Sequence, residues 1–167
     1  MMKFTHLDAQ GNVKQVPIQE KPVVYRRAKA TGFIRLSGEV LQKIKSDSIA
    51  KGNVLAVARV SGIQAAKKTA DLIPLCHSLN LDHVAIDFNL KEDGISVTSE
   101  VTCTAKTGVE MEALTAVQVS LLTIYDMCKA VDKNMRFENI HLIEKTKESV
   151  VPALAAKQSG TGGDPTC

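Results

Sequence analysis

The sequence predicts an α+β fold in which helices cover one face of an antiparallel sheet. Two runs of alternating apolar residues are joined by a turn, which is typical of a hairpin. Segments with the helical spacing of apolar residues lie before and after this hairpin. A further segment with alternating apolar residues lies at each end of this set of elements. With the first two helices counted as one crossover, the order β-α-β-β-α-β is the ferredoxin-like pattern.

One domain is expected over residues 1–154, and it begins with an arm of little regular structure. The arm, residues 1–24, is polar and contains Pro17 and Pro22. The tail, residues 155–167, is rich in glycine and serine and is predicted to be disordered. Helices on one face leave the other face of the sheet open, so we expect the chain to self-associate.

The first strand and two helices are predicted from the next part of the chain. Apolar and small residues alternate over residues 27–36, and Ser37 fits the N-cap of a short helix. Asn53 fits the cap of a second helix that runs to about Leu72, because Pro74 prevents its continuation. The start of this helix has equal strand propensity, but a smooth face of small side chains favours a helix.

The hairpin and the last strand have the clearest alternation. Apolar residues alternate over 84–90 and 95–103, and the sequence KEDG at 91–94 forms the turn between them. A last strand is predicted over about 135–143. Only four Phe, two Tyr and no Trp are present, which is a poor supply of base-stacking side chains.

Composition excludes several functional classes. The net charge of +3 is too small to indicate duplex DNA binding, although converging basic side chains would suit a small polyanion. No apolar run is long enough to span a bilayer, and residues 1–14 lack the apolar core of a signal peptide. The four cysteines form no C-x-x-C pair, which indicates reduced thiols and a cytoplasmic protein.

A long helix over about 109–132 carries the first candidate chemistry. Thr107 and Glu110 fit a capping box at its start. Near its end, Asp126 and Lys129 lie three positions apart and so share one face. They form either an exposed ion pair worth about 0.2–0.5 kcal/mol or a working pair in which apolar neighbours lower the lysine pKa. The residues alone leave these alternatives about equal.

Other candidates lie in two segments and one turn. The segment after Pro74 displays Cys76 and His77, and this histidine is either structural or a phosphate-contacting acid–base group. The adjacent pair supplies no tetrahedral zinc set. Glu112 is not explained by the helix cap that accounts for Glu110, and it could accept hydrogen bonds from a guanine-like ring. Lys51 precedes Gly52 and the start of a helix, a position that favours the binding of an anion.

Two long blocks together resemble one known family. They are KGNVLAVARVSGIQAAKKTADLIPLCHSL, residues 51–79, and KTGVEMEALTAVQVSLLTIYDMCKAVDK, residues 106–133. Both are similar to the molybdenum cofactor biosynthesis protein C family, the cyclic pyranopterin monophosphate synthases. The resemblance extends over about residues 5–147.

The resemblance implies a lyase without a redox cofactor. Its substrate would be the GTP-derived nucleotide 3′,8-cyclo-7,8-dihydroguanosine 5′-triphosphate, and its products cyclic pyranopterin monophosphate and pyrophosphate. An Mg²⁺ ion could bridge the phosphates, but the sequence shows no carboxylate cage for a metal. The resemblance also implies a homohexamer, a trimer of dimers, with active sites at subunit interfaces. No nucleic-acid or membrane partner is expected.

The motifs carry site roles over to particular positions. The catalytic residues implied are Asp126, Lys129 and Lys51. The substrate-binding residues implied are Leu75, Cys76, His77, Met111 and Glu112, with Glu110, Arg26 and Lys145 as further pocket positions. Lys129 would act as a general acid–base with a lowered pKa, Lys51 would stabilise the phosphates, and Arg26 with Lys145 would hold the triphosphate.

The chain departs from the family pattern at two points. Ser78 stands where the family has a proline, and EKTKESV, residues 144–150, lacks the glycines of the family's last segment. Two alternatives belong to other functional classes. One is a nucleotide sensor without catalysis, and the other is a single-stranded RNA-binding module that would use Phe88 and Phe137.

Overall fold

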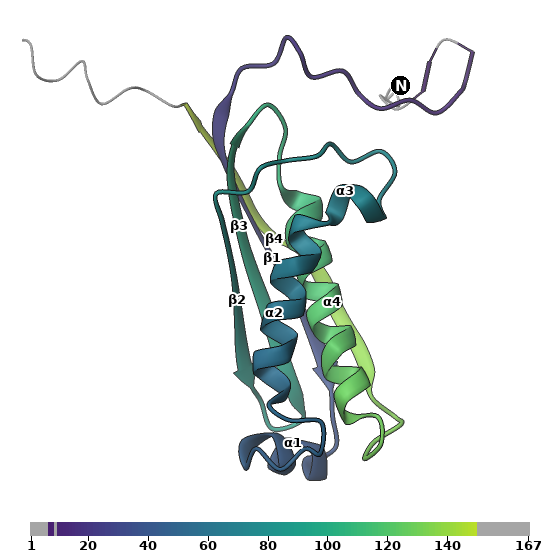
Figure 1. The fold of residues 1–167 in the computed structure, drawn as a ribbon, viewed down its shortest axis with the longest axis vertical. Helices are drawn as coiled ribbons and strands as arrows, with labels where there is room; N and C mark the ends of the chain where they lie inside the picture. Colours follow the sequence, from purple (N-terminus) through teal and green to yellow (C-terminus); the bar gives the residue numbers. More distant parts are fainter. Residues whose placement is uncertain (1–6, 9, 150–167) are drawn as a thin grey trace, which may run out of the picture.

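The computed structural model describes residues 7–8 and 10–149, so the tail expected to be disordered lies outside the described residues. The elements follow the predicted order (Figure 1). They are β1 Val24–Arg35, α1 Gly38–Lys45, α2 Val54–Lys67, α3 Thr69–Leu72, β2 His83–Leu90, β3 Gly94–Ala105, α4 Glu110–Cys128 and β4 Arg136–Ser149. The described helices include none with the length and hydrophobicity that a membrane crossing requires.

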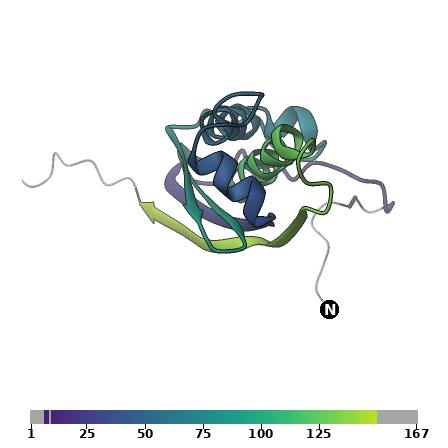
Figure 2. The same cartoon turned by 90° about the horizontal axis from the view of Figure 1, so that it is seen from below.

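The four strands form one antiparallel sheet in the order β2-β3-β1-β4. Helices α2 and α4 pack side by side on one face of this sheet (Figure 1; Figure 2). The predicted α+β, ferredoxin-like arrangement is confirmed. The first and last strands of the chain, β1 and β4, are longer than expected, and they pair from Val24 with Ser149 to Arg35 with Arg136.

The predicted helix starts are confirmed at two of three positions. The Ser37 side chain accepts a hydrogen bond from the Val40 amide, and the Asn53 side chain accepts one from the Ala56 amide at 2.9 Å. The capping box at Thr107 is wrong: α4 follows Val109 with no side-chain cap, and Glu110 bonds to a lysine of β4 instead. The long helix also ends at Cys128, four residues earlier than predicted.

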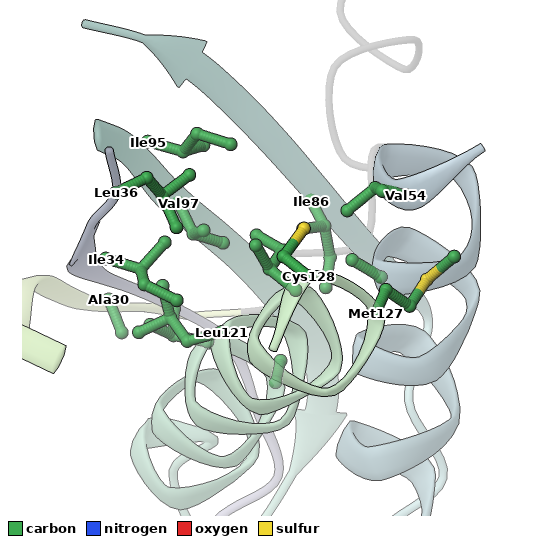
Figure 3. Close-up of a cluster of buried hydrophobic side chains, with 14 of the residues drawn as sticks. Ala30, Ile34, Leu36, Val54, Ile86, Ile95, Val97, Leu121, Met127 and Cys128 are labelled. Atoms are coloured by element: carbon green, nitrogen blue, oxygen red, sulfur yellow. The ribbon is translucent and has the colours of Figure 1, made fainter. Parts of the chain in front are cut away.

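The core lies between the sheet and the two long helices (Figure 3). Gly62 of α2 shows how closely the helices approach, because a Cβ atom there would lie 2.2 Å from the Ser120 Oγ of α4 and 2.3 Å from Ile86 Cδ1. The smooth face expected for α2 therefore has a packing role. Core side chains drawn in Figure 3 include Ala30, Ile34, Leu36, Val54, Ile86, Ile95, Val97, Leu121, Met127 and Cys128.

The face of the sheet without helices is charged. Alternate residues of β1 enter the core, so the positions between them face the other way. There Arg27 bonds to Glu100 at 3.0 Å and to Glu144 at 3.2 Å, and Lys29 reaches the same Glu100 at 2.9 Å. This face does not require an apolar cover, so it gives no reason of its own for self-association.

The two aromatic side chains considered for RNA binding lie on the helix side of the sheet. Phe88 packs against the core, with the Arg59 guanidinium of α2 at 5.3 Å from its ring centroid. The Phe137 ring lies 5.7 Å from the Tyr125 ring of α4. Neither ring forms a base-stacking surface on the open face, so the sheet does not support the RNA-binding alternative.

Candidate active site

The structure brings together the three side chains predicted to be catalytic. Asp126 lies in the last turn of α4, and Lys129 follows as its C-cap. The Lys129 ammonium is 2.7 Å from Asp126 Oδ1, and the Lys51 ammonium is 2.8 Å from Asp126 Oδ2. Lys51 also donates to the backbone carbonyl of Asp126 at 2.8 Å. One carboxylate therefore holds two ammonium groups, and we call these three residues the lysine cluster.

A tight turn places Lys51 in this cluster. The Gly52 amide donates to the Ile49 carbonyl at 2.9 Å, and Gly52 has a φ of +95°, which a side chain would strain. Asn53 then caps α2. The turn and the start of α2 together direct Lys51 toward the end of α4.

The electrostatics of the lysine cluster differ from the prediction. Hydrogen bonds from Lys129 and Lys51 lower the pKa of Asp126 to about 2. The hydrogen bond to Asp126 raises the pKa of Lys129, so the predicted lowering by apolar surroundings is wrong. The reason is exposure: the side chains of Lys129, Asp126 and Lys51 are 53, 55 and 47% accessible in the single chain. With all three groups ionised, the cluster has a net charge of +1.

A cavity of about 460 Å³ lies at the opposite end of α4. It brings together six of the eight predicted substrate-binding residues: Leu75, Cys76, His77, Glu110, Met111 and Glu112. Part of its wall comes from the segment after α3 and part from the first turn of α4. We call this space the ring cavity.

A cleft of about 330 Å³ adjoins the ring cavity, since Gly108 and Glu110 line both. It contains the two remaining predicted binding residues, Arg26 and Lys145. The Lys145 ammonium is 3.3 Å from Glu110 Oε1, while Arg26 is fixed by donating to the Ala105 carbonyl at 3.0 Å. This basic cleft suits a polyanion next to the ring cavity.

Five lining residues of the basic cleft were not among the predicted site residues: Arg27, Gly108, Val109, Thr146 and Lys147. Lys147 was identifiable in principle, because it stands two positions after Lys145 on the same strand. Side chains two apart on a strand share a face. Lys147 is also the cross-strand partner of Arg26. The segment at residues 144–150 lacks the glycines of the family pattern, but it still supplies basic groups to the cleft.

Glu112 is the most buried ionisable side chain of the ring cavity, with 4% of its surface exposed. Burial raises its pKa, and none of the ion pairs among the described residues includes it. Burial likewise raises the pKa of the Cys76 thiol, with Glu112 adding to the effect. Cys76 is therefore unsuited to act as a thiolate nucleophile. Glu112 is suited to accept hydrogen bonds from a ligand ring.

The ring cavity and the lysine cluster do not meet within one chain. Glu112 and Asp126 stand fourteen positions apart on α4, which corresponds to about 21 Å along the helix axis. Proton transfer requires contact at roughly 3 Å or through one water molecule. A single chain therefore presents two separate halves of the predicted site.

A family comparison covers the residues of both halves. The sequence model of the MoaC family matches residues 15–148, a range that contains every predicted catalytic and substrate-binding residue. The chain belongs to the MoaC family. The resemblance found in residues 51–79 and 106–133 is thereby confirmed.

Relatives in the MoaC family are similar over most of their length. A cyclic pyranopterin monophosphate synthase of Novosphingobium aromaticivorans is 53% identical over 145 residues, which cover 87% of this chain and 92% of that protein. The protein of the same name from Natranaerobius thermophilus is 49% identical over 146 residues, covering 86% and 92%. That from Chloroflexus aggregans is 52% identical over 145 residues, covering 86% and 88%.

Proposed function

We propose that this MoaC family protein is a cyclic pyranopterin monophosphate synthase, a lyase of molybdenum cofactor biosynthesis. The observation that carries the proposal is the meeting of Lys51 and Lys129 on Asp126, at distances of 2.8 and 2.7 Å. Lys51 stands 75 positions before Asp126 in the sequence, so its contact depends on the fold, and the family resemblance implies a catalytic role for all three residues. The names of the relatives support the same activity.

The proposed substrate is 3′,8-cyclo-7,8-dihydroguanosine 5′-triphosphate, and the products are cyclic pyranopterin monophosphate and pyrophosphate. The basic cleft, with Arg26 and Lys145, would hold the triphosphate. The adjoining ring cavity would hold the purine-derived part, with Glu112 accepting hydrogen bonds from its N–H groups. Glu110 lines both spaces, which supports this assignment, because the two parts of one ligand would then lie next to each other.

The lysines act as cations and proton donors in this proposal. Because Asp126 raises the pKa of Lys129, this side chain enters the reaction protonated and can give a proton to a leaving or ring nitrogen. Lys51 would stabilise the negative charge that develops on the phosphates during cyclisation and pyrophosphate release. Asp126 keeps both ammonium groups in place.

The complete site would be shared between two copies of the chain. Glu112, Val119 and Asp126 are spaced by seven residues and so lie along one stripe of α4. An isologous two-fold contact centred on Val119 would set Asp126 of one copy against Glu112 of the other. This arrangement joins the two halves that one chain keeps about 21 Å apart.

An apolar groove of about 390 Å³ at Val119 fits such a contact. Leu72 and Leu122 line it with 60 and 56% of their surfaces exposed, and Phe137 is 43% exposed. We propose that a second copy covers this groove, as a first step to a homohexamer of three dimers. Light scattering of the purified chain should give a multiple of two, and Leu122→Glu should reduce it. A monomeric wild-type protein would contradict the shared site.

The proposal includes no redox cofactor, and it places the reaction in the cytoplasm. Any Mg²⁺ would be brought by the triphosphate. In residues 7–8 and 10–149, no three His, Cys, Asp or Glu side chains gather to hold a metal ion. Addition of a chelator during turnover tests the metal requirement directly.

Pyrophosphate release from the synthetic cyclised nucleotide tests the activity. The wild-type protein should release one pyrophosphate for each cyclic pyranopterin monophosphate formed, and GTP should release none. Tight binding of the cyclised nucleotide without pyrophosphate release would support the sensor alternative instead. Failure to bind it at all would remove the substrate assignment.

A further inference from the structure

We propose that the N-terminal arm, residues 13–23, forms part of the substrate site, where it fixes the tautomer of His77 and adds Lys21 to the ring cavity. This inference rests on the proposed function. The sequence predicted an arm of little regular structure, and in the structure the arm crosses the end of the molecule where α3 and the start of α4 lie (Figure 1). It lines the ring cavity with Val16, Ile18 and Lys21.

Three long-range hydrogen bonds hold the arm in this position. The Gln15 side-chain amide donates to the Cys76 carbonyl at 2.9 Å. His77 Nε2 lies 2.9 Å from the Val16 carbonyl oxygen. The Lys106 ammonium donates to the Gln19 carbonyl at 2.6 Å. Two of these contacts reach the segment assigned to substrate binding, so the arm and the cavity wall form one unit.

The contact with Val16 decides the protonation pattern of the His77 ring. A carbonyl oxygen can only accept, so the ring nitrogen that faces it must carry a proton. Neutral His77 is therefore the Nε2–H tautomer, and Nδ1 is the ring atom left to accept a hydrogen bond from a ligand. Pro17 strengthens this contact, because it restricts Val16 to extended conformations and so limits the directions of its carbonyl.

His141 offers an internal comparison with the opposite pattern. Its Nδ1 lies 2.7 Å from the Asn139 carbonyl, so neutral His141 is the Nδ1–H tautomer by the same argument. The two histidines should thus give distinguishable nitrogen signals in one sample. His141 is exposed on β4, away from the arm, and serves as a reference that arm variants should not change.

Lys21 changes the charge of the ring cavity. It is the only lysine or arginine among the described residues that line this cavity, while Glu110 and Glu112 supply two acidic groups. A turn from Ile18 to Lys21 places it there, with the Lys21 amide donating to the Ile18 carbonyl at 3.1 Å. A cation at this position would attract an anionic nucleotide to a cavity whose own walls are acidic.

Nitrogen NMR of the full-length, ¹⁵N-histidine-labelled chain tests the tautomer. The wild-type protein should show His77 as Nε2–H and His141 as Nδ1–H, with His77→Gln used for assignment. The Gln15→Ala/Lys106→Met double variant removes two of the three hydrogen bonds, so the His77 signals should shift toward a mixture of tautomers while those of His141 stay. An Nδ1–H His77 in the wild type would overturn the proposal, and so would unchanged His77 signals in the double variant.

Steady-state kinetics provide the second test. One neutral hydrogen bond corresponds to a factor of about five in an equilibrium constant. We therefore expect the KM of the double variant and of Lys21→Met to rise about fivefold or more, with a smaller change in kcat. Lys14→Met is the matched control, since Lys14 belongs to the same arm but takes part in none of the three hydrogen bonds. An unchanged KM in both variants, or an equal rise in the control, would overturn the binding role. If the wild-type protein releases no pyrophosphate, the proposed function fails, whereas the NMR result still decides the position of the arm.

Discussion

The two ends of α4 place carboxyl groups in opposite environments. At the C-terminal end, Asp126 is exposed, and hydrogen bonds from Lys129 and Lys51 lower its pKa to about 2. At the N-terminal end, Glu112 is buried without an ion-pair partner among the described residues, and burial raises its pKa. The N-terminus of a helix by itself favours a carboxylate, so at Glu112 burial outweighs the helix dipole.

This difference separates a structural use of a carboxyl group from a ligand-binding one. Asp126 is fully engaged by two ammonium groups, and its contribution is to hold them. Glu112 has no such partner, so its oxygens are available to a ligand that enters the ring cavity. The C-terminal end of α4 is thus proposed to carry out proton transfer and to stabilise the reacting phosphates, while the N-terminal end binds the ring and the triphosphate.

Removing an ammonium group should have the largest effect. Lys129→Ala or Lys51→Ala should reduce kcat at least about 100-fold, the scale of a lost general acid or electrostatic stabiliser. The thermal midpoint should stay nearly unchanged because both side chains are about half exposed. Lys133→Ala is the matched control, since Lys133 lies beside the cluster and is not paired with Asp126. An equal loss of kcat in Lys133→Ala would mean that the lysines act only through their general positive charge, not through specific positions in the cluster.

Glu112→Gln should have an intermediate effect at the other end of the helix. It replaces an acceptor with an amide, so kcat/KM should fall about tenfold, the scale of one hydrogen bond to a charged group. Wild-type turnover in the variant would show that the ring is recognised elsewhere.

The same variant should change stability in a pH-dependent way. The folded pKa of Glu112 is raised above its ordinary value of 4.5, so its favourable contribution is present below pH 4.5 and is lost as the pH rises through the folded pKa. Glu112→Gln should therefore unfold at a higher temperature than the wild type at pH 7 and at a similar temperature at pH 4. Glu92→Gln, in the β2–β3 turn, controls for the loss of one charge. A difference independent of pH would contradict the burial argument.

The smallest effect is expected for the stability of the lysine cluster. The folded pKa of Asp126 is lowered from 3.8 to about 2, so its stabilisation is present above pH 3.8 and is lost as the pH falls through about 2. The thermal midpoints of the wild type and Asp126→Asn should differ slightly at pH 5 and converge near pH 2. The difference is small because exposed ion pairs contribute little. A constant difference from pH 5 to pH 2 would mean that the carboxylate is not stabilised by the two lysines.

Local patterns predicted most of the fold. The alternation in β2 and β3, the turn between them and the caps at Ser37 and Asn53 are all short-range signals, and the structure follows them. Thr107 was misassigned because its capping pattern competes with a tertiary contact, the bond of Glu110 to Lys145. Short-range rules contain no information about such long-range partners.

The residues of the candidate site could be proposed from the sequence, but their burial and their contacts could not. Apolar neighbours of Lys129 suggested desolvation, yet Met127 and Cys128 are buried while Lys129 turns outward at the helix end. The contacts of the arm depend on residues about sixty positions away, so the lining by Lys21 could not be inferred from the sequence. The sequence predicted the site residues, and the structure shows that these residues form two separate groups.

Complementation between two inactive variants tests the shared site most directly. Lys129→Ala lacks one end of the site and Glu112→Ala lacks the other, so each alone should release little pyrophosphate. Refolding the two together should restore about a quarter of wild-type activity, because half of the dimers are hybrids and each hybrid has one intact site of two. Differently tagged chains should co-purify, which shows that hybrids formed. If hybrids form and the mixture is no more active than its two components, the site is not shared between copies of the chain.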